Sequence, residues 1–335
     1  MTGIMRTAVG LLLLVALAAC SPRMAAESAD AGDARIAQDM LVMPDGARLP
    51  LHVWEPHGTV RPKAVVLGVH GFNDYGMGFD LAGEWFAAQD IKVYAYDQRG
   101  FGAAPHPGVW PSEERLARDL GHAVRLIKDR HPDTPVYVLG VSMGGAVALA
   151  AADQGHLPQV AGVVLSAPAV WARETMPFYQ RWALWLGAHT VPWVTLTGAG
   201  LDRSPTDNTR VLRTLAVDPK VIGATRIDSM YGLTNLMDTA LHAGDALAAP
   251  ALVLYGANDE IVPPEPTLRF WQTLKDRERV RLALYDEGWH MLLRDTQAFT
   301  VWHDIRTWMA APKDPLPSGA DEGALERLRT LADER

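Results

Sequence analysis

The chain has 335 residues, of which 48% are hydrophobic and 21% are charged, and its formal net charge is −8. This balance is typical of a globular protein, and the length is enough for one large core or two domains. The acidic balance gives no basic surface for nucleic acid, so we expect no nucleic-acid partner.

The N-terminus carries the features of a secretory signal. Arg6 precedes an apolar run at 8–19, which is shorter than the roughly 20 residues that a membrane-spanning helix needs. The run ends in Leu-Ala-Ala-Cys at 17–20, which resembles the lipobox of bacterial lipoproteins, where the cysteine is lipidated. An ordinary signal peptide with a chance cysteine is the alternative. Cys20 is the only cysteine, so no internal disulfide can form.

We therefore expect residues 1–19 to be a lipoprotein signal peptide. Lipidated Cys20 would hold the protein in the bacterial cell envelope, on the periplasmic side of the outer membrane. Residues 20–35 are small, polar and acidic and predict a tether between the lipid and the domain. The main domain is expected at 36–311. The tail at 312–335 is charged and contains prolines, and its last part, 322–335, is expected either to form a polar surface helix or to stay disordered.

In the main domain, apolar runs alternate with helical patterns. A hairpin is expected at 40–54, around the turn Pro44–Ala47. Buried strands are expected at 64–69, 92–96, 135–139, 162–165, 251–255 and 280–285, and helices at 79–89, 112–130, 143–153, 264–275 and 296–310. This alternation predicts an α/β fold, with a mostly parallel sheet covered by helices on both faces. Residues 169–249 break the alternation and predict a cap inserted where such sheets bind ligands.

One serine lies in a strand–turn–helix context. Ser142 is the centre of Gly-Val-Ser-Met-Gly at 140–144, between the apolar run 136–139 and a helix of small residues. A tight elbow of this kind lifts the hydroxyl above the sheet edge. Glycines flank the serine because a Cβ at either position would collide with the neighbouring strand or helix. A nucleophilic serine needs a neutral imidazole to accept its proton and an acid to orient that imidazole.

The imidazole and the acid are expected after the last two strands. His290 follows the last strand, in a loop that can bring its ring over the elbow, and Asp259 follows the penultimate strand. Asp286 and Glu287 are rivals for the acid, but we expect them to be solvated loop residues. The chain order Ser142, Asp259, His290 is that of the α/β-hydrolase connection.

The loop after the first parallel strand is the expected oxyanion loop. The backbone N–H groups of Phe72 and Met143 are the predicted donors. His70 is expected to shape this loop and not to act as the base, and Phe72 as a simple turn residue is the alternative. Asp97, which ends another strand, is expected to hold a glycine-rich turn with Arg99 nearby, and a role as a second acid is the alternative.

Five blocks of sequence together resemble the monoacylglycerol lipase and lysophospholipase group of α/β-hydrolases, which includes bacterial members grouped with the serine aminopeptidases. The resemblance covers about residues 38–310. The blocks are Val-His-Gly-Phe-Asn at 69–73, Tyr-Asp-Gln-Arg-Gly-Phe-Gly at 96–102, Leu-Gly-Val-Ser-Met-Gly-Gly at 139–145, Leu-Tyr-Gly-Ala-Asn-Asp at 254–259 and Gly-Trp-His at 288–290. The resemblance implies the α/β-hydrolase fold, with Ser142 as nucleophile, His290 as base and Asp259 as orienting acid.

Two blocks depart from the family pattern. Phe72 stands where family members often carry a small residue, and Gly-Phe-Gly-Ala-Ala at 100–104 stands where their turn often reads Gly-His-Gly with a nearby serine. The departures leave the triad intact but weaken the inference of a glycerol substrate. Asp74, close to the oxyanion loop, is a candidate to meet the leaving-group alcohol.

An apolar stripe is expected in the cap, because Phe178, Trp182, Trp185 and Leu186 fall at helical spacing. The stripe either packs the cap onto the main domain or forms an apolar entrance for an acyl chain at a membrane. Lipidation of Cys20 would place such an entrance near bilayer substrates. Trp182 and Trp185 are therefore candidate substrate-binding residues.

The sequence thus predicts a serine ester hydrolase that acts on a monoacylglycerol or a lysophospholipid through an acyl-enzyme. We expect neither a metal nor an organic cofactor, because no His/Cys/Asp cluster has ligand spacing. One alternative is an aminopeptidase of the same fold, in which Glu174 would bind the substrate amine. Another is a non-catalytic envelope protein that uses the fold only for binding.

Overall fold

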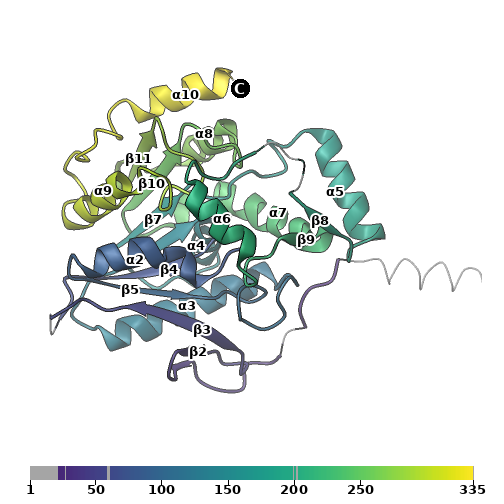
Figure 1. Ribbon diagram of the computed structural model, residues 1–335, viewed down its shortest axis with the longest axis horizontal. Coiled ribbons are helices and arrows are strands. Elements are labelled where there is room, and N and C mark those ends of the chain that lie inside the picture. Colours follow the sequence, from purple (N-terminus) through teal and green to yellow (C-terminus); the bar gives the residue numbers. More distant parts are fainter. Residues whose placement is uncertain (1–21, 27, 59–60, 199, 201–202, 335) are drawn as a thin grey trace, which may run out of the picture.

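The computed structural model describes residues 22–26, 28–58, 61–198, 200 and 203–334 (Figure 1). Cys20 and the expected signal peptide lie outside the described residues. A nine-stranded sheet has the order β1-β2-β3-β5-β4-β6-β7-β10-β11. Its strands are β1 (Arg35–Ile36), β2 (Met40–Val42), β3 (Arg48–Trp54), β4 (Ala64–Val69), β5 (Ile91–Tyr96), β6 (Val136–Val141), β7 (Gly162–Ser166), β10 (Ala251–Gly256) and β11 (Val280–Tyr285).

The sheet is mostly parallel, as the sequence predicts. The strands from β5 to β11 pair in parallel, and the hairpin β2–β3 joins their edge antiparallel to β5. The parallel strands β4, β5, β7 and β10 are buried along their whole length, because helices cover both of their faces.

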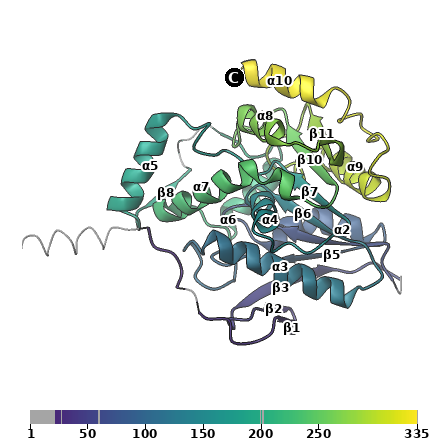
Figure 2. The same ribbon diagram turned by 180° about the vertical axis from the view of Figure 1, so that it is seen from behind.

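Helices pack on both faces of the sheet (Figures 1 and 2). One core contains side chains of α2 (Asp80–Ala87) and α9 (Ala298–Ala310). The core on the other face contains side chains of α3 (Glu113–Arg130), α4 (Met143–Asp153) and α8 (Pro264–Thr273). Short 3-10 helices lie at η1 (Gly76–Phe79), η2 (Gly244–Ala246) and η3 (Arg277–Arg279).

The insertion after β7 forms a separate cap. It contains α5 (Phe178–Thr190), β8 (Thr195–Thr197), α6 (Thr209–Val217), β9 (Ala224–Arg226) and α7 (Ile227–His242). β8 and β9 form a two-stranded antiparallel ribbon of their own. α7 buries Leu236 and Leu241 in the main core, whereas α5 buries only Ala188 and stands away from the sheet (Figure 1).

Both ends of the described chain pack on the domain. The segment expected to be a tether lies along it, because Asp30 pairs with Arg115 at 2.8 Å and the N–H of Ala25 donates to Trp110 O at 2.9 Å. In the C-terminal tail, α10 (Ala324–Glu334) buries Leu328 in the core. Of the helices in the described part of the chain, none is long and apolar enough to cross a membrane.

Candidate active site

Ser142 occupies a strained elbow between β6 and α4. Its φ of 51° and ψ of −115° are unusual for a residue with a side chain. A Cβ on Gly144 would lie 1.9 Å from the carbonyl oxygen of Val69, and one on Gly140 would lie 2.6 Å from the backbone of Gly144. Glycine at both positions therefore lets β6, β4 and α4 approach closely enough to hold the serine in this conformation.

The loops after β6, β10 and β11 open on the same edge of the sheet. Val141 is in register with Ser166, Ser166 with Leu254, and Leu254 with Ala283. Because these strands are parallel, the residues that follow them emerge together at their carboxyl ends. Ser142, Asp259 and His290 all lie in or directly beyond this edge.

Asp259 and His290 are in direct contact. Nδ1 of His290 lies 2.8 Å from Oδ2 of Asp259, and both side chains are buried. The N–H groups of Ile261 and Val262 donate to the other carboxylate oxygen, at 2.8 and 2.9 Å. Asp259 is thus held by its own loop, and it can fix the imidazole with Nε2 pointing away from the carboxylate.

The acid and histidine loops also touch through their backbones. The N–H of Asn258 donates to Gly288 O at 2.8 Å. A Cβ on Gly256 would lie 2.5 Å from the backbone of Gly288 and from Trp289 O, so glycine is needed at this crossing. The two loops therefore form one rigid unit next to Asp259 and His290.

The oxyanion loop is shaped by a buried histidine. The N–H of Gln98 donates to Nε2 of His70 at 2.9 Å, so Nδ1 carries the proton and donates to Gly71 O at 2.8 Å. Burial lowers the pKa of His70, which keeps the ring neutral. Because a trans peptide points its C=O and N–H in opposite directions, the N–H of Phe72 faces away from the His70 ring.

That loop lies beside Ser142. A Cβ on Gly71 would be 3.5 Å from Cβ of Ser142. Met143 is the first residue of α4, so its N–H is one of the groups that have no partner within the helix. The loop of Gly71 and Phe72 and the start of α4 therefore both adjoin Ser142.

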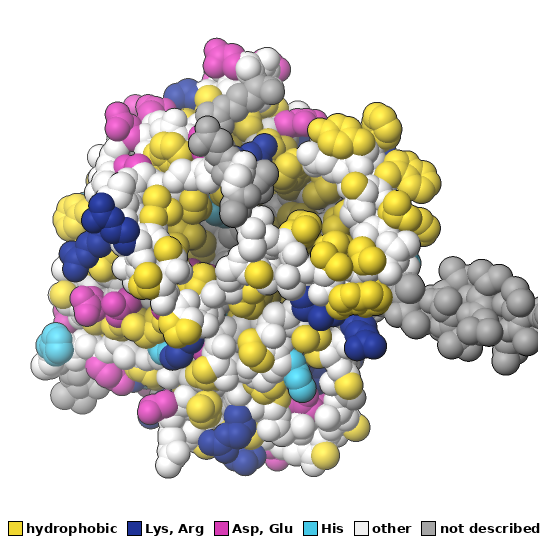
Figure 3. Space-filling view, turned by 45° about the vertical axis from the view of Figure 1, so that its right-hand side comes forward, with side chains coloured by type: hydrophobic (Ala, Val, Ile, Leu, Met, Phe, Trp, Pro, Cys, Tyr) yellow, Lys and Arg dark blue, Asp and Glu magenta, His cyan; other side chains and the backbone are white. Residues whose placement is uncertain are grey.

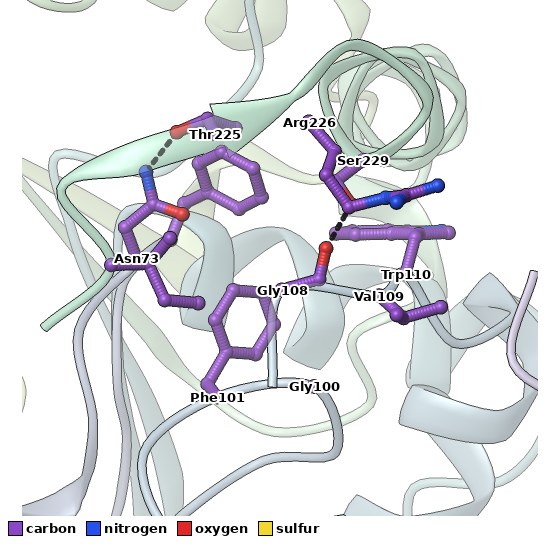
Figure 4. A pocket seen from close by; sticks show the side chains of 11 residues that line it. Asn73, Gly100, Phe101, Gly108, Val109, Trp110, Thr225, Arg226 and Ser229 are labelled. Atoms are coloured by element: carbon purple, nitrogen blue, oxygen red, sulfur yellow. Dashed lines mark hydrogen bonds between the residues drawn. The ribbon is translucent and has the colours of Figure 1, made fainter. Parts of the chain in front are cut away.

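The two departures from the family pattern pack against each other. The rings of Phe72 and Phe101 lie 5.6 Å apart, and the ring of Trp110 lies 6.1 Å from Phe72 and 6.5 Å from Phe101. Figure 4 shows Phe101 and Trp110 with residues of β9 and α7 around a hollow too narrow to admit water. This aromatic cluster supports the oxyanion loop from the side of the cap.

Asp97 holds the glycine-rich turn after β5. Its buried carboxylate accepts hydrogen bonds from the N–H groups of Gly76 and Ala103, both at 2.9 Å, and contacts Nε2 of His52 at 2.9 Å. Burial opposes its ionisation, but these hydrogen bonds hold the pKa of Asp97 below its ordinary value. Arg99 is engaged elsewhere, in ion pairs with Asp45 and Asp119.

The structure places Asp74 in an ion pair. Its Oδ2 lies 2.7 Å from a guanidinium nitrogen of Arg294, which also donates through Nε to Gly78 O at 2.7 Å. The pair ties the oxyanion loop to the loop that carries His290. Because 220 residues separate the partners, the sequence gives no sign of the contact. Nearness in the chain to an expected site residue is the one feature that could have drawn attention to Asp74 and Arg294, since each lies within five positions of such a residue.

The apolar stripe of α5 points outward. Trp182 is 66% exposed and Trp185 46%, and their rings pack on each other at 6.0 Å. Figure 3 shows hydrophobic side chains gathered over α5 at the upper right of the molecule. The exposure does not fit a role in packing the cap onto the main domain. The large apolar residues exposed from α5 to β8 are Phe178, Tyr179, Trp182, Trp185, Leu186, Val191, Trp193, Val194 and Leu196.

A cavity borders the acid loop below the cap. Its volume is about 450 Å³, and it is open to solvent. Asp259 and Glu260 line one side, and Trp171, Pro177 and Arg203 of the cap line the other. Among the described residues, no group of three or more His, Cys, Asp or Glu side chains is placed to hold a metal ion.

The sheet, the serine elbow and the Asp–His pair at one edge define an α/β-hydrolase with an inserted cap. Residues 60–297, more than half of the chain, match the family described as serine aminopeptidase, S33. The chain belongs to this family.

Curated relatives agree with this assignment. The monoacylglycerol lipase of Mycolicibacterium smegmatis is 28% identical over 274 residues, which are 79% of this chain and 94% of the relative. The monoglyceride lipase of Homo sapiens is 26% identical over 278 residues, which are 81% of this chain and 89% of the relative. The chain is an enzyme of the carboxylic ester hydrolase class.

Solved structures show the same fold. A soluble variant of monoglyceride lipase from Saccharomyces cerevisiae, in complex with a substrate analog, superposes with a TM-score of 0.68 at 22% identity. The likeness covers 86% of this chain and 97% of the other. The monoacylglycerol lipase of Paleococcus ferrophilus gives a TM-score of 0.63 at 20% identity, over 78% of this chain and 98% of the other.

Proposed function

We propose that this enzyme is a serine hydrolase that cleaves a monoacylglycerol or a lysophospholipid, with Ser142, His290 and Asp259 as its catalytic triad. The contact between Nδ1 of His290 and Oδ2 of Asp259 carries the proposal. It supplies an oriented base at the sheet edge where the elbow presents Ser142.

In the first half-reaction, Oγ of Ser142 attacks the acyl carbonyl carbon while Nε2 of His290 accepts the hydroxyl proton. The carbonyl oxygen becomes an oxyanion and receives hydrogen bonds from the N–H groups of Phe72 and Met143. The bond between the carbonyl carbon and the alcohol oxygen then breaks. His290 gives its proton to the leaving alcohol, and the acyl group stays on Ser142.

In the second half-reaction, water replaces the alcohol. His290 accepts a proton from water, whose oxygen attacks the acyl carbon, and the same two N–H groups stabilise the new oxyanion. The bond to Oγ of Ser142 breaks, and the proton returns to Ser142. The products are a fatty acid and the free enzyme.

The relatives support an acyl ester of glycerol as the substrate. Curated relatives from a bacterium and a mammal are both named as lipases of monoacylglycerol, and each match covers about four fifths of this chain. Because Phe72 and the turn at 100–104 depart from the family pattern, a lysophospholipid stays within the proposal. The two substrates share a single acyl chain and differ in the head group.

The proposed place of action is a membrane surface, reached through a lipid on Cys20. The described chain begins at Pro22, two residues after this cysteine. Met24 and Ala25 lie against Trp110 on the side of the cap helix α7, which packs on α5. The lipid and the exposed aromatic residues of α5 would therefore meet the same bilayer. The lipobox-like sequence at 17–20 is the ground for proposing a location on the periplasmic side of the outer membrane.

An aminopeptidase is the weaker candidate. It needs a carboxylate near the substrate amine, and the candidate Glu174 is already paired with Arg269 at 2.8 Å and with His242 at 3.3 Å. The hydrogen bond from Arg269 lowers the pKa of Glu174, in keeping with this engagement.

A fluorophosphonate probe and a substrate panel test the proposal. The wild type should be labelled, and Ser142→Ala should not. The panel contains monoacylglycerols and lysophospholipids of matched chain length, short soluble esters and aminoacyl amides. Fastest turnover of the two lipid classes supports the proposal. Equal labelling of Ser142→Ala, or turnover confined to the amides, contradicts it.

A further inference from the structure

A short segment of the cap is bonded to the loop that carries His290. Residues 205–208 precede α6 and make five hydrogen bonds to residues 291–296, one of them from Oγ1 of Thr296 to Oδ2 of Asp207. The N–H of Met291 donates to Pro205 O at 2.9 Å, Oγ1 of Thr206 to Oδ1 of Asp295 at 2.6 Å, the N–H of Thr296 to Oδ1 of Asp207 at 2.9 Å, and Nδ2 of Asn208 to Arg294 O at 2.9 Å. The cap and the histidine loop therefore meet through a continuous polar seam.

Asp295 is the centre of this seam. Its side chain is buried, and its Oδ2 accepts the N–H of Trp289 at 2.7 Å. Trp289 directly precedes His290, so this bond fixes the Gly288–Trp289 peptide, one residue before the Cα that carries the imidazole. The other carboxylate oxygen is held by Thr206, which is also buried. One carboxylate thus joins the cap to the backbone of Trp289, the residue before His290.

The charge of Asp295 also bears on the imidazole. Burial raises the pKa of Asp295 to about 6, and the neighbouring charge of Asp207 acts in the same direction, while the charge of His290 opposes both. Asp295 is therefore ionised at neutral pH. Its negative charge and the charge of protonated His290 attract each other.

We propose that Asp295 is a positioning residue for His290 and that Thr206 makes this positioning depend on the cap. The inference rests on the proposed triad, because Asp295 would act only through His290, the proposed base, and would not contact the substrate. The cap then has a role besides substrate access: a displaced cap would release Asp295, and with it the Gly288–Trp289 peptide that leads into His290.

The first test compares Asp295→Ala with Asp295→Asn in the full chain, on a short soluble ester. Asp295→Ala leaves the N–H of Trp289 unpaired, so kcat should fall about 10- to 100-fold with KM within about twofold. Asp295→Asn keeps an acceptor oxygen for that N–H, so it should recover part of kcat. Because it lacks the charge, the acidic limb of its kcat/KM profile should move to lower pH by about half a unit.

Two further variants separate positioning from stability. Thr206→Val keeps the shape of the side chain but removes its bond to Asp295, so kcat should fall about 3- to 10-fold with an unchanged KM. Asp304→Asn alters another fully buried carboxylate, which accepts Tyr285 Oη at 2.9 Å on α9. It should lower the free energy of unfolding and leave the pH profile unchanged.

The inference is overturned if folded Asp295→Ala keeps kcat within twofold of the wild type. It is also overturned if the profile of Asp295→Asn coincides with those of the wild type and Asp304→Asn. If Asp295→Ala does not fold, Asp295→Asn and Thr206→Val decide by the same criteria. His290→Ala separates failure of the positioning role of Asp295 from failure of the proposed triad. If this variant stays active, the triad itself is wrong.

Discussion

Nδ1 of His290 and Oδ2 of Asp259 lie 2.8 Å apart, although 31 residues separate the two in the chain. The contact depends on the parallel pairing of β10 with β11, which brings the ends of both strands to the same edge. It also depends on a crossing of the two loops that only glycine at position 256 permits. The backbone thus brings the Asp259 carboxylate to the imidazole, and the carboxylate orients the ring.

Asp259→Asn should lower kcat about 10⁴-fold on a soluble ester, because an amide can present a donor to Nδ1 and favour the wrong tautomer. Asp286→Asn is the matched control. Asp286 is an exposed acid after β11 and pairs with Arg327 at 2.8 Å. Steady-state kinetics should show this control within about twofold of the wild type. A large loss in Asp286→Asn with little in Asp259→Asn would reverse the assignment of the acid.

Gly144→Ala should lower the free energy of unfolding by about 3 kcal/mol or prevent folding, because the added Cβ would lie 1.9 Å from Val69 O. Gly223→Ala has no atom within 4 Å of the added Cβ and serves as the control. Urea denaturation measures both. If the two variants unfold at the same urea concentration, the close approach of α4 to β4 is not as described.

His70→Gln should change how stability depends on pH. The pKa of His70 is lowered by burial, so below about pH 6.5 the unfolded chain binds a proton that the folded chain does not. The wild type therefore loses stability through this group as the pH falls below that value. The loss should be smaller in His70→Gln, as measured by urea denaturation at pH 7 and pH 5. The exposed residue His57, changed to Gln, should leave the wild-type slope unaltered.

The double variant Trp182→Ala/Trp185→Ala should lose activity on long-chain monoacylglycerol in vesicles, about tenfold, because exposed aromatic rings contribute to binding at the bilayer interface. Its activity on a short soluble ester and its Tm should stay near wild type, since both rings are exposed. Phe299→Ala removes another exposed aromatic ring, on α9, and should not affect vesicle activity. Equal losses on both substrates would instead indicate a structural role in the cap.

The strand and helix pattern carried most of the fold. Buried strands that alternate with amphipathic helices have few arrangements other than a parallel sheet covered on both faces. The strands at 64–69 and 251–255 could therefore be predicted from their apolar runs alone. The sequence did not predict that the C-terminal tail packs on the domain. Whether Leu328 of α10 is buried depends on a groove beside α8 and β11, which the tail's own sequence does not describe.

The sequence by itself determined the class of chemistry, because Ser142, Asp259 and His290 each follow a recognisable strand and their order is characteristic of the fold. Only the tertiary structure decided what surrounds them. Asp74 pairs with Arg294, and Thr206 with Asp295, across 220 and 89 residues. Contacts of this kind leave no local period in the sequence, since they arise where loops from distant strands meet at one edge. The same holds for Trp182 and Trp185: their spacing predicts a helical face, and only the packing of the cap shows that this face points to solvent.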